Sequence, residues 1–152
     1  MTMFSAIDIA SSGLSAQRMR MDVIAGNIAN VNTTRTEEGG PYIRKRTIME
    51  TKGKEMEFFW YLPPWKQAPV PSGPGKGVQI AEVKEETVEP FKLVYDPSHP
   101  DANNEGYVLL PNVNVVEEMV DMITASRAYE ANVSTIKAKG KMDAAAIQIG
   151  KA

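Results

Sequence analysis

The sequence predicts an α+β protein: long helices at the two ends pair as a coiled coil, with a small β-rich region inserted between them. Two observations predict this arrangement. Apolar residues recur every three or four positions near both ends of the 152-residue chain, as in a helix that buries one face. Between these stretches, short alternating segments are separated by glycine, proline and asparagine, which is typical of strands joined by turns.

The C-terminal helix is expected to begin at Asn114. Asparagine is a favourable N-cap residue, and Glu117 follows at the spacing of a capping box. Pro111 lies before the helix because proline is not tolerated in a helix interior. Past the apolar row the helix meets Gly140, so the sequence leaves open whether it continues or breaks there. The predicted apolar row is Val115, Met119, Met122, Tyr129, Val133 and Ile136, with Ser126 as its polar member.

Residues 3–31 are expected to form the partner helix, about 43 Å long at 1.5 Å per residue. Its opposite face is rich in serine and carries few charges, whereas a solvated helix face normally carries Glu and Lys. That face is predicted to contact neighbouring subunits, the alternative being a compact bundle with a serine-rich back. Asn30 and Asn32 are expected to close the helix, because Asn tolerates the left-handed conformation. The apolar row is Ile7, Ala10, Leu14, Met21, Ile24, Ile28 and Val31, with Gln17 polar.

The chain is predicted to divide into residues 1–34, a β-rich region 35–110, and residues 111–152. In the middle region we expect strands in 42–49, in 78–95 on either side of a break at Glu85 and Glu86, and in 107–110. A loop rich in proline and aromatic residues is expected at 51–77. The basic triplet at 44–46 is interpreted as a strand edge that is solvated or paired with acidic groups, rather than as a phosphate site.

The amino-acid composition argues against several classes of function. The chain has no cysteine, one histidine and a net charge of −2, which disfavours thiol chemistry, zinc sites and nucleic-acid binding. No stretch approaches the roughly 20 apolar residues of a membrane span, and no cleaved signal sequence is expected. Two alternatives stay open: an enzyme or metal site at Asp96, His99 and Asp101, and an adaptor that binds through the aromatic and proline-rich loop 58–74.

The two long helices favour a structural role. A single pair of helices leaves much of each apolar stripe uncovered, and self-assembly is the natural way to cover it. An assembly protein is therefore a better interpretation than an enzyme.

Several stretches resemble the rod and hook axial proteins of the bacterial flagellum. The segments 12–21 and 27–34 resemble the helix of this family and its closing motif. The segments 38–42, 94–103, 105–108, 111–123 and 127–133 are similar to one group of rod proteins within the family.

The resemblance implies a subunit of the basal-body rod, the shaft that carries motor torque to the hook. It further implies export by the flagellar type III apparatus and assembly with copies of itself and other rod proteins. The terminal helices would form an inner layer around a central channel, with no catalytic residue, cofactor, small-molecule substrate or membrane insertion. The expected interface residues are Ile7, Leu14, Met21, Ile24 and Ile28 on one helix, and Met119, Met122, Tyr129, Val133 and Ile136 on the other.

Overall fold

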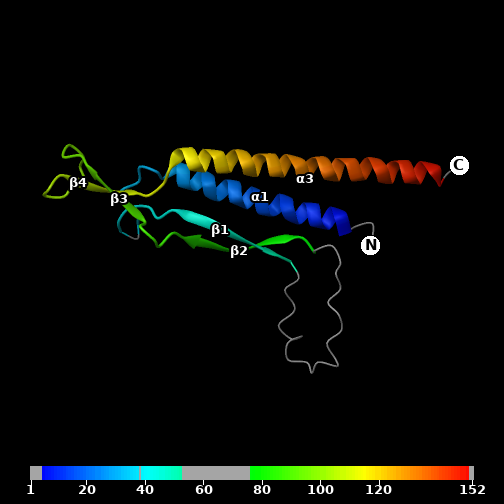
Figure 1. The fold of residues 1–152 in the computed structure, drawn as a ribbon, viewed down its shortest axis with the longest axis horizontal. Helices are drawn as coiled ribbons and strands as arrows, with labels where there is room; N and C mark the ends of the chain where they lie inside the picture. Colours follow the sequence, from blue (N-terminus) through cyan, green and yellow to red (C-terminus); the bar gives the residue numbers. More distant parts are fainter. Residues whose placement is uncertain (1–4, 38, 53–75, 151–152) are drawn as a thin grey trace, which may run out of the picture.

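The computed structural model describes residues 5–37, 39–52 and 76–150, which form two long helices and four strands (Figure 1). With the labels of Figure 1, the elements are α1 (Ser5–Ala29), β1 (Lys45–Thr51), β2 (Val78–Glu85), β3 (Phe91–Tyr95), β4 (Tyr107–Pro111) and α3 (Val115–Ile149). The predicted mixed α+β class is confirmed. The expected loop at 51–77 lies almost wholly outside the described residues, and 58–74 lies wholly outside them.

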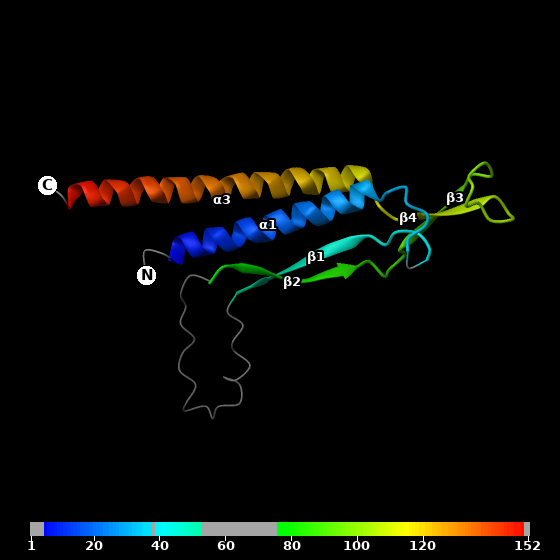
Figure 2. The same ribbon diagram turned by 180° about the vertical axis from the view of Figure 1, so that it is seen from behind.

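The two helices lie side by side and run in opposite directions, as Figures 1 and 2 show. Near one end of the pair, Asn27 of α1 contacts Glu118 of α3. Farther along, Arg20 pairs with Asp121 at 3.3 Å. Still farther, a Cβ atom on Gly13 would lie 3.0 Å from the side chain of Asn132, so the helices approach closely there.

The β1–β2 hairpin covers α1 on another side, so that α1 lies between α3 and the hairpin (Figure 2). The strands are antiparallel, with Lys45 opposite Glu85 and an irregularity after Ile48. Ser12 of α1 accepts a hydrogen bond from the Val78 amide at 3.0 Å and is 7% exposed. The serine-rich back of the first helix is thus partly covered by its own chain, which differs from the expected contact with a neighbour.

The β3–β4 hairpin lies beyond the ends of the helices (Figure 1) and forms a second two-stranded antiparallel sheet. The Tyr95 and Tyr107 rings meet edge to face, with centroids 5.3 Å apart. Val108 is buried, whereas Leu93 is exposed. The predicted strands in 78–95 and 107–110 are confirmed, and they belong to separate sheets.

The structure shows where each of the two helices ends. α3 continues through Gly140 to Ile149, which answers the question that the sequence left open. α1 ends at Ala29, two residues before the predicted boundary. There the Asn30 side chain donates to the Gly26 carbonyl at 2.9 Å, which satisfies one of the free carbonyls at the helix end.

The apolar core of the described residues is small. Three of its five buried apolar side chains are alanines, which lets the helices and hairpin approach closely but buries little surface. None of the described helices combines the length and apolarity needed to cross a bilayer. The buried apolar residues are Ala10, Ala16, Ile24, Val108 and Ala125.

Gly77 permits the contact between α1 and the β1–β2 hairpin. It has φ +104°, and an added Cβ would lie 2.3 Å from the Ser12 hydroxyl oxygen. We expect Gly77→Ala to lower the free energy of unfolding in urea by more than about 1 kcal/mol. The matched control is Gly140→Ala, which meets nothing within 4 Å and should raise it by up to about 1 kcal/mol. Equal effects of the two changes would contradict this account.

Candidate functional site

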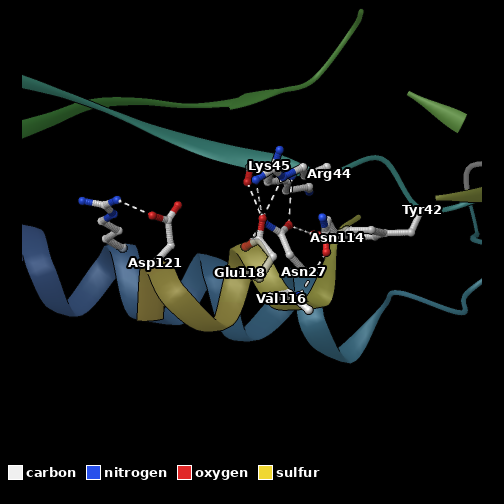
Figure 3. A network of polar contacts seen from close by, with 9 residues as sticks. Asn27, Tyr42, Arg44, Lys45, Asn114, Val116, Glu118 and Asp121 are labelled. Carbon is white, nitrogen blue, oxygen red and sulfur yellow. Dashed lines mark hydrogen bonds and ion pairs between the residues drawn. The ribbon is translucent and has the colours of Figure 1, made fainter. Parts of the chain in front are cut away.

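Asn27 lies at the junction of α1, β1 and α3, and its side chain is 2% exposed. Its Nδ2 donates to the Lys45 carbonyl at 2.9 Å and to Glu118 Oε2 at 3.1 Å. Its Oδ1 accepts from the Lys45 amide and the Tyr42 hydroxyl, each at 3.0 Å. An amide side chain has two N–H donors and two acceptor sites, so Asn27 is fully satisfied here (Figure 3).

Glu118 is the charged partner in this junction. It lies in the first turn of α3 and is 2% exposed. Its Oε1 accepts from Arg44 Nε at 2.7 Å and Nη2 at 2.6 Å, and its Oε2 accepts from Asn27. A buried carboxylate is tolerated only when it is paired and hydrogen-bonded, and both conditions hold (Figure 3).

The basic triplet at 44–46 supplies the strand side of the junction. Arg44 pairs with Glu118, and Lys45 Nζ lies 3.6 Å from Glu85. The interpretation of this triplet as acid-paired is therefore confirmed for Arg44 and Lys45.

The start of α3 sets the direction in which Glu118 points. Asn114 is the N-cap, and its Oδ1 accepts from the Val116 amide at 3.1 Å. Its backbone carbonyl accepts from the Glu118 amide at 3.0 Å, which begins the helical hydrogen bonds. Glu117 is exposed to solvent, and Asn32 is an exposed turn residue after α1.

A groove of about 640 Å³ lies beside the junction and is lined by α1, β1 and α3. Basic groups such as Arg20 and Arg46 share its lining with acidic Glu117 and apolar Val120. Within the part of the chain that the structure describes, no group of three or more His, Asp or Glu side chains could hold a metal ion. The interactions observed at this site are hydrogen bonds and ion pairs.

The loop that holds the histidine is used for internal contacts. Asp101 accepts from Arg35 Nη2 at 2.7 Å and from Thr34 Oγ1 at 2.8 Å. His99 Nδ1 accepts from the Asp101 amide at 3.1 Å. Hydrogen bonds from Ser98 lower the pKa of Asp96 below its usual value. These side chains tie the loop to the segment after α1.

Comparison with known proteins identifies the family. A family model described as flagella basal body rod protein matches residues 7–35, and one described as flagellar basal body rod FlgEFG protein C-terminal matches residues 104–149. The flagellar basal-body rod protein FlgC of Borreliella burgdorferi is 48% identical over 98% of each chain. The FlgC proteins of Bacillus subtilis and Escherichia coli O157:H7 are 41% and 34% identical, each over 99% of this chain and 100% of the relative.

The chain belongs to the flagellar basal-body rod protein family. It is a structural subunit of the rod of the flagellar basal body, as predicted. In this rod subunit, the buried junction joins the two stretches that match the family models: Asn27 lies in the first and Glu118 in the second.

The apolar residues predicted for the rod subunit's interface lie in different environments. Ile24 is buried, and Met119 is 55% exposed. The other eight are half-buried: Ile7, Leu14, Met21, Ile28, Met122, Tyr129, Val133 and Ile136. In the contact with α1, the structure places Glu118 at the position where the sequence row had Met119. A role for Met119 between subunits stays a prediction.

Sequence reasoning missed the polar half of the helix contact. One row of buried and half-buried positions on α3 recurs at alternating steps of three and four, and it includes Glu118, Ala125 and Asn132 as well as apolar residues. A search for apolar residues alone selects Met119 and Val133 instead. The contact row could have been found by following this alternating spacing even where it falls on polar or small residues. The full row is Val115, Glu118, Met122, Ala125, Tyr129, Asn132 and Ile136.

Glu118 should dominate the stability of the junction. Glu118→Ala leaves Arg44 and Asn27 without their shared partner, so we expect about 3 kcal/mol less unfolding free energy in urea. The control is Glu117→Ala, the neighbouring exposed residue, which should cost about 0.5 kcal/mol through the helix dipole. Similar losses in the two variants would show that the junction does not stabilise the fold.

Tyr42 should make stability fall at alkaline pH. Burial raises the pKa of its hydroxyl above 10.0, and the nearby charges of Glu118 and then Glu85 raise it further. Because the folded state holds this proton more tightly, the contribution is complete below about pH 10, the unfolded pKa, and is lost as pH rises through the folded pKa.

Removing the Tyr42 hydroxyl tests this. Tyr42→Phe should cost about 1 kcal/mol at neutral pH by removing a hydrogen bond to Asn27. It should also lose less stability than the parent between about pH 9 and pH 11. Urea unfolding across this range measures both. Stability curves that stay parallel at high pH would contradict the assignment.

Proposed function

We propose that this rod subunit pairs α1 and α3 as a coiled coil and that many copies pack these pairs into the inner layer of the rod. Residues 1–34 and 111–152 would form that layer, and residues 35–110 its outer part. The observation that carries the proposal is the buried junction between Asn27 and Glu118, which fixes two family-matched helices against each other. The alternating three- and four-residue spacing on α3 supports the same geometry.

The proposed interface contains the ten apolar residues predicted from the sequence. Eight of them are half-buried in a single subunit, which supports this role because neighbours can cover the apolar surface that is still exposed. Met119 fits a contact between subunits better than one within a subunit, since it is exposed on α3. Asn30, Asn32, Asn114 and Glu117 would act as helix-end and turn residues that fix the lengths of the packed helices.

In the assembled rod, the packed helices would transmit motor torque to the hook and enclose the export channel. Many helix contacts acting in parallel would supply the torsional stiffness. The partners would be other copies of this chain and other rod proteins, after delivery by the flagellar type III apparatus without a cleaved signal. We infer no catalytic function, because the relatives are rod proteins, Asp101 pairs with Arg35, and His99 accepts a hydrogen bond within its own loop.

Met122 offers a direct test of the helix contact. Met122→Asp introduces a charge among half-buried side chains without a partner, and it should abolish rod assembly. The measurement is swimming in a strain that lacks this subunit and is complemented with the variant, with immunoblotting to confirm equal protein levels. Met122→Leu, which conserves volume, should restore swimming. Full swimming with Met122→Asp would show that the contact is misplaced.

A further inference from the structure

α3 carries a second apolar stripe, distinct from the side that contacts α1. From Val116 to Ile149, exposed residues recur in steps of four, three and four, and this pattern repeats three times. The large members are Val116, Val120, Ile123, Met142 and Ile149, which are 54–79% exposed. Three further members are alanines, and Arg127 and Ser134 are the two polar ones.

The stripe follows a different line along α3 from the contact with α1, and its first members, Val116 and Val120, also line the groove beside the junction. At about 100° per residue, Val120 is about 200° around the helix from the buried Glu118. A repeat of 11 residues corresponds to about 3.67 residues per turn, close to the 3.6 of a straight helix, so the stripe stays on one side along its length. It is about 50 Å long, and no described part of the chain covers it.

The length of the stripe points to another long helix as its occupant. Of the two described helices, α1 has 25 residues and already lies between α3 and the β1–β2 hairpin. α3 has 35 residues and carries the stripe along nearly its whole length. A second copy of this chain therefore supplies a suitable partner in its own α3.

Charge selects which parts of the two helices meet. Exposed Glu117 and Glu130 flank the first half of the stripe, and exposed Lys137 and Lys141 flank the second half. Each lies three or four positions from a stripe residue and so on an adjacent part of the surface. Like halves would repel and unlike halves attract, which selects register more than it adds affinity.

Side-chain size agrees with an offset of 22 residues, or two repeats, between the α3 helices of the two copies. In a parallel arrangement this offset places Val116 against Ala138 and Ile123 against Ala145, so that large residues meet small ones. Val120 then lies against Met142. The offset also brings Glu117 of one helix beside the basic flank at Lys137 and Lys141 of the other.

We propose that residues 116–123 of one copy dock on residues 138–145 of α3 in a second copy, with both helices pointing the same way. The proposal rests on the self-assembly described under the proposed function and names the surface that carries it. Because the two contacting segments differ, each copy can bind one neighbour at each end, and the contact does not close on itself.

The absence of cysteine from the chain makes disulfide cross-linking a clean test. Purified full-length Val120→Cys and Met142→Cys variants are oxidised separately, as a mixture, and as a double variant. Each single variant should form no disulfide-linked dimer, and the mixture should form disulfide-linked dimers. The double variant should form a ladder of disulfide-linked species larger than dimers. The yield should fall at high salt, because the selecting charges are exposed.

The matched control replaces Val120→Cys with Ser15→Cys, an exposed position on α1 away from the stripe. Mixed with Met142→Cys, it should give only the background of random collision. Val120→Cys dimers without Met142→Cys, a mixture no better than the Ser15 control, or a double variant that stops at dimers would each overturn the proposal. The last outcome would indicate an antiparallel, closed pair instead.

The test separates this contact from the role in the rod. Cross-linking uses the purified chain, whereas the Met122→Asp assay measures swimming in cells. Failure to cross-link together with the expected Met122 result would remove only the docking surface. Cross-linking as expected together with full swimming for Met122→Asp would remove only the helix contact proposed within the rod.

Discussion

The arrangement of this subunit depends on one buried carboxylate. Glu118 has almost no contact with solvent, and it is stabilised only where Arg44 and Asn27 reach it together. Arg44 precedes β1 and Asn27 lies on α1, so the charge can be buried only when three separate parts of the chain meet. The small core could tolerate several sliding positions of the helices. The ion pair tolerates far fewer, because any slip leaves a charge buried without a partner.

Much of the secondary structure followed from local sequence signals. The N-cap at Asn114, the turns that bound the strands and the long apolar rows all act within a few residues, and they placed both helices and the later strands well. The start of β1 was less accurate, because Tyr42 and Arg44 point their side chains into the junction and the strand pairs only from Lys45. That requirement comes from tertiary contacts.

The sequence predicts that the two helices contact each other, but it predicts the contacting residues less accurately. Apolar residues mark a row on α3 that includes Met119, whereas the structure uses Glu118. No local property of Glu118 reveals that Arg44, 74 positions away, will neutralise it. One residue on the serine-rich side of α1, Ser12, is explained in a similar way. Ser12 needs no neighbouring subunit, because Gly77 lets its own hairpin approach within hydrogen-bonding distance.

α3 therefore presents two surfaces with different periods. The side that contacts α1 repeats every seven residues and mixes polar with apolar groups. The exposed side repeats every 11 residues and is mostly apolar. The first surface is specific because its polar groups must find particular partners, whereas apolar contacts on the second are non-directional and its register depends on side-chain size and flanking charge.

The separation between Asn27 and Glu118 also determines when the subunit can fold. These residues are 91 positions apart, so bringing them together closes about three-fifths of the 152-residue chain into one loop. The length-dependent part of that entropy cost is about 4 kcal/mol. A chain that emerges with its N-terminus first presents α1 long before α3. Because α3 begins only at Val115, α1 has no helix to pair with until the last quarter of the chain has emerged, and the junction cannot close before then.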